Sequence, residues 1–228
     1  HYRLVTLTGS GGIGKTRLSQ EVGYASMPSF PDGVFFIALA PLNDPSLIAA
    51  TIIQALGFLE VKNQSPLERL KDGLHAKRLL LILDNVAAAT QFTSFLNQLV
   101  NSSEYSRLLV TSHEPIRLEG GIVLQVSGLE YPAPGEELLQ FDASLFDRYP
   151  SLALFEERAT RSLPSFSINQ ENWKAVVRIC RFFQGMPLGI EICAAQVYTR
   201  SPEQIANFLE SGFQRAAEEA NPDPFMEK

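Results

Sequence analysis

The chain has 228 residues, of which 45% are hydrophobic and 19% are charged. This composition is typical of a soluble globular protein and excludes a largely disordered one. The formal net charge of −6 argues against a broad nucleic-acid-binding face in this segment, because such faces neutralise phosphates with clustered Lys and Arg.

The cysteines argue against a cysteine-based metal site, and the apolar segments argue against a membrane-spanning protein. Cys180 and Cys193 lie in helix-like apolar patterns without metal-ligand spacing to a histidine, so we expect two buried thiols. The most apolar stretch, 34–59, is interrupted by prolines and polar residues, so no segment reaches membrane-spanning length. Without a secretory signal, we expect a cytoplasmic protein. The chain enters a strand pattern almost directly after His1, which suggests a piece of a longer protein.

Strand and helix patterns alternate in the first part of the chain. We expect strands at 3–8, 34–39, 79–84, 108–111 and 122–126. We expect helices at 16–25, 45–57 and 66–76, the last with Ser65 as N-cap, and a fourth whose buried face is Phe92, Phe95, Leu96, Leu99 and Val100. This alternation predicts a doubly wound, five-stranded parallel α/β sheet.

The remainder of the chain has helical patterns only. Candidate helices are 151–161, 170–183, 187–199 and 202–211. Prolines and a glycine punctuate the segment that precedes them. We therefore predict an α/β domain at 1–130, a linker at 131–150, a small all-helical subdomain at 151–212 and a flexible tail at 213–228.

One complete motif carries the chemistry. The residues Gly9, Ser10, Gly11, Gly12, Ile13, Gly14, Lys15 and Thr16 match G-x-x-x-x-G-K-[ST], between an expected strand and an expected helix. The glycines let consecutive backbone N–H groups point inward, and the helix N-terminus adds its positive dipole end. The motif predicts that Lys15 binds the phosphates of ATP or ADP, that Thr16 binds Mg²⁺, and that Arg17 lies beside the nucleotide. The sheet is thus predicted to be that of a P-loop NTPase.

Asp84 is the second candidate for the site. It ends an apolar strand pattern about seventy residues after the loop, at the sheet edge where open α/β folds bind ligands. Alone, such an Asp is equally consistent with a solvated strand end. With the loop, it predicts a magnesium-shell carboxylate, so Lys15 and Asp84 are the predicted catalytic residues.

With these motifs the sequence resembles the STAND class of signal-transduction ATPases, in particular the NB-ARC-like nucleotide-binding domains of bacterial transcriptional regulators. Four segments carry the resemblance: RLVTLTGSGGIGKTRL at 3–18, LLLILDNV at 79–86, LLVTSHEPIRL at 108–118 and GMPLGIEICAA at 185–195. The resemblance implies a γ-phosphate-sensing arginine where this chain has His113, with Arg117 as a substitute. It also implies that Pro187 packs near the nucleotide, although a proline in the first turn of a helix needs no such role.

One expected acidic residue is missing. Relatives place a second acid at or shortly after the magnesium aspartate, whereas this chain continues Asn85-Val86-Ala87-Ala88. Losing a positioned base typically costs about 10²–10⁴ in rate, and losing an arginine at the γ-phosphate about 10³–10⁵. Glu114 could supply the base, although a solvated loop position suits a glutamate better. His1 and His75 receive no role.

Three functions remain open from the sequence. The first is a regulatory switch set by ATP or ADP with Mg²⁺ and reset by slow hydrolysis. The second is a non-hydrolysing nucleotide-binding module, and the third a small-molecule kinase, for which we find no second-substrate motif. The resemblance implies effector and sensor domains elsewhere in a longer chain, and it leaves open a nucleotide-dependent oligomer.

Overall fold

The computed structural model describes residues 2–39, 44–59, 63–87, 89–136, 141, 142 and 144–220, with no side chains for 214–220. The chain divides into two compact units, 1–126 and 127–228.

The first unit is an α/β unit built on a parallel five-stranded sheet. Its strands are β1 Leu4–Thr8, β2 Val34–Ala38, β3 Leu80–Asp84, β4 Arg107–Ser112 and β5 Gly121–Gln125. Their spatial order is β2-β3-β4-β1-β5, and every neighbouring pair is parallel. The five predicted strands are thereby confirmed, each to within one residue at either end.

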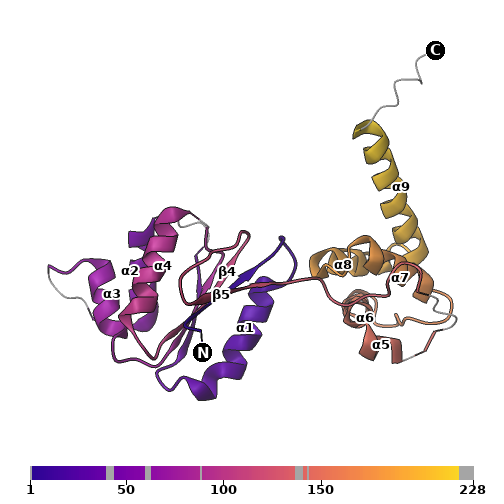
Figure 1. Cartoon of the computed structure of the whole chain (residues 1–228). Helices are drawn as coiled ribbons and strands as arrows, with labels where there is room; N and C mark the ends of the chain where they lie inside the picture. The colour runs from indigo at the N-terminus through magenta and orange to yellow at the C-terminus, as the bar shows by residue number, and fades with distance from the viewer. Residues whose placement is uncertain are drawn as a thin grey trace, which may run out of the picture. The chain divides into compact units, whose positions relative to one another are not determined.

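Helices cover both faces of this sheet, as the doubly wound prediction requires. The helices are α1 Lys15–Ser26, α2 Pro45–Leu56, α3 Pro66–Leu74 and α4 Thr90–Ser102. Figure 1 shows α1 on one face and α2, α3 and α4 on the other. All five residues of β3 are buried, with Leu81 and Leu83 in the larger core and Leu80 and Ile82 in the smaller one. A strand covered on both faces is therefore continuously apolar up to its last residue.

Local signals fix the ends of the surface helices. The Asp44 side chain accepts a hydrogen bond from the Ser46 N–H at the start of α2, and Gly57 ends that helix at φ 67°. Ser65 and Glu68 form a reciprocal capping box at the start of α3. These local interactions explain why the sequence pattern located both helices closely.

The strand register brings the carboxyl ends of all five strands to one edge. Thr8 at the end of β1 pairs with Ser112 of β4 on one side and with Gln125 of β5 on the other. Asp84 pairs with Ala38 at the end of β2. Because all strands are parallel, the loop after β1, the acid at the end of β3 and the residues after β4 meet at this edge.

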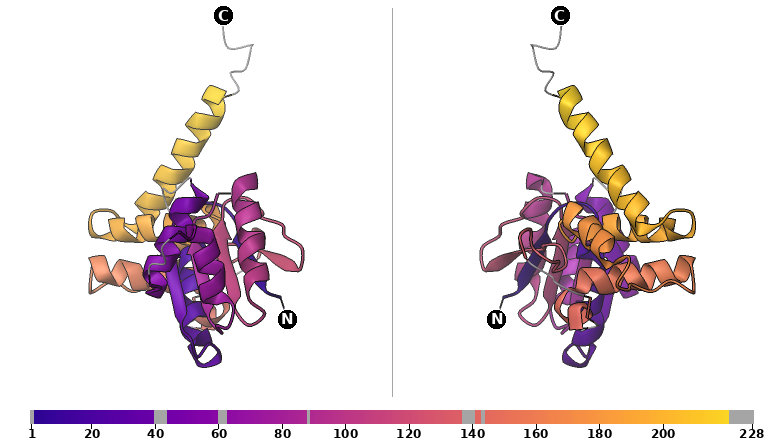
Figure 2. Two further views of the ribbon diagram at one scale, coloured as in Figure 1. Left: turned by 90° about the vertical axis from the view of Figure 1, so that its left-hand side faces the viewer. Right: turned by 90° about the vertical axis from the view of Figure 1, so that its right-hand side faces the viewer.

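The second unit consists of helices around its own core. They are α5 Ser144–Arg148, α6 Pro150–Ser162, α7 Trp173–Phe182, α8 Pro187–Ala194 and α9 Pro202–Ala220, with a short 3₁₀ turn at Ala195–Tyr198. The core includes Phe155, Val176, Ile190 and both buried cysteines. Figures 1 and 2 show α9 reaching beyond the other helices of this unit.

The predicted linker, the predicted tail and the start of the helix predicted at 170–183 differ in the structure. The segment 131–150, predicted as a linker, contains α5 and buries Leu145 and Tyr149 in the helical core, so the described part of it belongs to that unit. Helix α9 continues through Gly212 to Ala220, where a tail was predicted from 213. Helix α7 begins at Trp173 because the Asn169 side chain holds residues 171 and 172 in a turn. Residues 221–228 and His1 lie outside the described residues.

In the described part of the chain, no helix is both long enough and apolar enough to cross a membrane.

Candidate functional site

The loop between β1 and α1 has the backbone of an anion cradle. Gly9, Gly12 and Gly14 have φ values of 152°, 75° and 99°, in the region that side-chain-bearing residues rarely adopt. A Cβ atom on Gly9 would lie 2.9 Å from the Val126 carbonyl oxygen, so this position has no room for a side chain. Gly14 is the N-cap of α1 and supplies no side-chain cap, which leaves the first N–H groups of the helix free for a ligand.

Lys15 is folded back onto this loop. Its side-chain ammonium donates hydrogen bonds to the carbonyl oxygens of Gly9, at 2.8 Å, and Ser10, at 2.9 Å. Only 8% of the residue is exposed. Burial lowers the pKa of Lys15 below its usual 10.5, and the negative charge of Asp84 opposes that shift. A buried cation that donates its hydrogen bonds to neutral carbonyls favours an anionic ligand at the loop.

Thr16 and Asp84 meet although they come from distant parts of the sequence. The Thr16 hydroxyl lies 2.9 Å from Asp84 Oδ1 and 3.1 Å from Oδ2. Together they present a hydroxyl and a carboxylate beside the loop, oxygen ligands of the kind that Mg²⁺ prefers. The structure thus brings together Lys15, Thr16 and Asp84, three of the residues chosen from the sequence.

Thr111, near the end of β4, completes the surroundings of Asp84 and was not identified from the sequence. Its hydroxyl donates to Asp84 Oδ1 at 2.6 Å and accepts the Asn85 N–H at 2.8 Å. The residue is 1% exposed. Threonine is common in strands for packing reasons alone. The pattern therefore gave no signal that its hydroxyl touches the aspartate.

His113 and Arg117 lie beside the start of the phosphate loop, in the cavity that Gly9 and Ser10 also line. The Thr8 hydroxyl donates to the His113 carbonyl oxygen at 3.2 Å, and a Cβ atom on Gly11 would lie 3.7 Å from His113 Cε1. Both residues line a half-open cavity of about 770 Å³, together with Gly9, Ser10 and residues of β5. His113 and Arg117 therefore share a cavity with the start of the phosphate loop.

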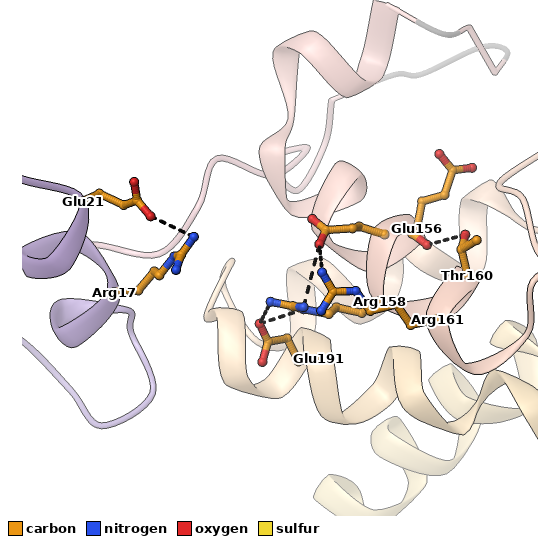
Figure 3. A network of polar contacts seen from close by, with 8 residues as sticks. Arg17, Glu21, Glu156, Arg158, Thr160, Arg161 and Glu191 are labelled. Carbon is orange, nitrogen blue, oxygen red and sulfur yellow. Dashed lines mark hydrogen bonds and ion pairs between the residues drawn. The ribbon is translucent and has the colours of Figure 1, made fainter. Parts of the chain in front are cut away.

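Three other predicted residues have different surroundings, each within its own unit. Arg17 is exposed and pairs with Glu21 one turn further along α1, at 2.8 Å (Figure 3). Glu114 is exposed in the loop after β4 and is not among the residues that line the cavity. Pro187 is the first residue of α8, where a proline needs no intrahelical partner for its missing N–H.

Gly185, two residues before Pro187, packs against the start of its own unit. The Leu129 N–H donates to the Gly185 carbonyl oxygen at 2.8 Å, and a Cβ atom on Gly185 would lie 1.9 Å from the Leu129 carbonyl oxygen. Helix α8 is also tied to α6, because Arg158 pairs with Glu191 at 3.1 Å (Figure 3). Position 185 therefore requires glycine for a steric reason that is independent of any nucleotide.

The parallel sheet, the glycine loop and the lysine, threonine and aspartate at its edge define a P-loop NTPase domain. Residues 1–117, about half of the chain, match the family described as the AAA domain. The chain belongs to this family, and membership implies nucleotide binding.

Curated relatives and solved structures resemble the chain over most of its length. A Mycobacterium tuberculosis protein named as an HTH-type transcriptional regulator is 35% identical over 216 residues, which cover 94% of this chain and 22% of that protein. The regulatory protein AfsR of Streptomyces coelicolor is 27% identical over 204 residues, covering 85% of this chain and 18% of AfsR. The chain therefore spans about a fifth of the length of these relatives. Cdc6p from Pyrobaculum aerophilum matches with a TM-score of 0.54 at 16% identity, over 95% of this chain and 57% of that one, which shows a shared fold.

The residues present fit a nucleotide with Mg²⁺. The glycine backbone, the buried ammonium and the free helix N-terminus suit phosphates, while Thr16 and Asp84 suit the metal. Within the described ranges, no group of three or more His, Cys, Asp or Glu side chains is arranged to hold a metal ion. Thr16 and Asp84 supply two protein oxygens, and Mg²⁺ is usually held by one or two protein oxygens together with phosphates and water.

Proposed function

We propose that this chain is the nucleotide-binding regulatory domain of a larger signal-transduction or transcriptional-regulator protein, with ATP or ADP and Mg²⁺ as its ligands. The observation that carries the proposal is the contact between Thr16 and Asp84 beside a glycine loop that holds a buried lysine. The named relatives support the regulatory context, since two of them are called regulators.

Each residue has one role in this proposal. Backbone N–H groups of 9–16 and the Lys15 ammonium bind the phosphates, the Thr16 hydroxyl binds the metal, and Asp84 orders the metal's water molecules. Bound Mg²⁺ would supply charge neutralisation for the phosphates. His113 or Arg117, which share the cavity at the loop, distinguish ATP from ADP through the γ-phosphate.

The proposed mechanism is a STAND-type switch. A ligand can shift a conformational equilibrium only through contacts that differ between the two states. The γ-phosphate, present in ATP and absent in ADP, is such a difference. Pro187, at the start of α8, carries the signal into the helical unit in this scheme, and slow hydrolysis resets it.

A non-hydrolysing binding module is the second candidate, and the turn after β3 favours it. Asn85 adopts a left-handed conformation with φ 63°, and its backbone N–H is bound by Thr111. Residues 85–87 carry no acid that could activate water. Without a positioned base, hydrolysis is expected to be slower by about 10²–10⁴.

A single-turnover experiment separates the two candidates. Excess protein with Mg²⁺ is mixed with γ-labelled ATP, and bound label and released phosphate are followed for several hours, with Lys15→Ala as the blank. Phosphate release above the blank supports the hydrolysing switch. Label that stays bound and uncleaved excludes hydrolysis by this segment and leaves the binding module.

A further inference from the structure

Thr111 is the residue of β4 that touches the proposed magnesium aspartate. Its hydroxyl oxygen lies 2.6 Å from Asp84 Oδ1, on the strand next to β3 in the sheet. The residue is 1% exposed, so bulk water does not compete for this contact. The contact is shorter than either distance between Thr16 and Asp84.

The direction of this hydrogen bond is fixed by a second contact. A threonine hydroxyl has one proton to donate and two lone pairs to accept with. The Asn85 N–H can only donate, and at 2.8 Å it occupies one lone pair of the Thr111 oxygen. The hydroxyl proton therefore points to Asp84 Oδ1, which must accept it.

The same residue also holds the turn that follows Asp84. The Val86 N–H donates to the Thr111 carbonyl oxygen at 2.9 Å, so two successive N–H groups after Asp84 are bound by Thr111. Between them lies the left-handed Asn85, at φ 63°. Side chain and backbone of one residue thus set both the carboxylate orientation and the path of the chain behind it.

We propose that Thr111 is a positioning residue for the metal site: it holds Asp84 in the orientation that receives Mg²⁺ with the nucleotide. This inference rests on the proposed function of the site. Thr16 cannot take over this task, because its hydroxyl is itself an expected metal ligand. Thr111 holds Oδ1 by a contact that does not compete with the metal.

The test measures how strongly Mg²⁺ tightens the binding of a fluorescent N-methylanthraniloyl-ADP probe to the whole chain. The readout is the Mg²⁺ concentration at half-maximal tightening, compared with the probe affinity in excess EDTA. Thr111→Val removes the hydroxyl while keeping the shape, and Thr111→Ser keeps the hydroxyl. Thr6→Val is the matched control, because Thr6 is equally buried on neighbouring β1 and its hydroxyl donates to the Ile116 carbonyl oxygen instead of Asp84.

In Thr111→Val we expect the half-maximal Mg²⁺ concentration to rise by about 10- to 100-fold, the usual effect of removing a group that orients a metal ligand. Affinity in EDTA should stay the same, Thr111→Ser should restore the wild-type value, and Thr6→Val should not shift it. If the valine variant does not fold, Thr111→Ala, which leaves space for water beside the Asn85 N–H, should show the same shift.

Two results would overturn the inference: an unchanged Mg²⁺ midpoint in the folded Val or Ala variant, or an equal shift in Thr6→Val. These two results can be distinguished from the results expected if the site does not bind a nucleotide at all. In that case the wild-type protein would not bind the probe, or Lys15→Ala would bind it equally well.

Discussion

The Thr16 hydroxyl lies 2.9 Å from Asp84 Oδ1, although 68 positions separate the two residues in the sequence. Parallel strands bring them together, because the helix after β1 begins at the edge where β3 ends. The contact gives the unit a ready pair of oxygen ligands beside its phosphate loop. The first prediction follows from this pair.

Asp84→Asn keeps the size of the side chain and removes its charge. We expect the tightening of ADP binding by Mg²⁺ to fall by about 10- to 100-fold, because an amide oxygen is a weaker partner for the metal shell. Affinity in EDTA should change little. Calorimetric titration with and without Mg²⁺ measures both values, and equal losses in both conditions would assign Asp84 to the fold instead of the metal.

Nucleotide affinity should depend on pH through Lys15. Burial lowers its pKa below 10.5, so the free protein loses this proton at a lower pH than an exposed lysine does. Bound phosphates favour the protonated form, so affinity falls as pH rises through the lowered pKa. The same shift means that the folding stability contributed by Lys15 increases with pH between the lowered pKa and 10.5, since the unfolded chain holds the proton there.

The measurement is ADP affinity across the alkaline range, with circular dichroism as the check on folding. Lys15→Arg should bind more weakly but without this pH dependence, because arginine stays charged. An identical pH profile in the arginine variant would show that another group titrates.

Gly185→Ala should disrupt the start of the helical unit. The added Cβ would lie 1.9 Å from the Leu129 carbonyl oxygen, and the residue has φ 73°. The left-handed conformation alone costs about 1–2 kcal/mol for a residue with a side chain, so we expect a loss of more than that in the free energy of unfolding. Gly212→Ala is the control: it lies within α9 with open space around it, and alanine there should be neutral or stabilising by up to about 1 kcal/mol. Urea unfolding measures both, and equal effects would contradict the steric account.

Arg178 should hold α9 against α7. Its guanidinium donates to Glu203, Asn207 and Glu210, and the Glu210 contact is the main reason why its pKa is raised. Such exposed pairs are each worth at most about 1 kcal/mol. Arg178→Met should therefore destabilise the unit modestly while speeding amide hydrogen exchange in α9. Unchanged exchange in α9 would show that apolar contacts alone hold the helix.

Much of the α/β unit could be predicted because its signals are local. A continuous apolar run identifies β3, and Ser65 with Glu68 marks the start of α3. The phosphate loop is a contiguous motif whose backbone requirements select its residue types. These features do not depend on which distant segments come to lie beside them.

The remaining features depend on tertiary contacts. Prolines suggested a linker at 131–150, but Tyr149 is buried there and bonds Glu136 through its hydroxyl. The helix predicted at 202–211 continues in the structure as α9 to Ala220. In the sequence Thr111 has the pattern of an ordinary strand residue. Its contact to Asp84 becomes visible only when β3 and β4 are paired in the sheet.

The most direct test of the central claim is a calorimetric titration of the chain with ADP and with ATP, each with Mg²⁺, in wild type and in Lys15→Ala. We predict saturable binding with one nucleotide per chain, weakened by about 10- to 100-fold in the variant, because a hydrogen bond to a charged group contributes about 1.5–3 kcal/mol. A folded wild-type protein that binds neither nucleotide, or a variant that binds both equally well, would contradict the assignment of this loop and Asp84 as a nucleotide site.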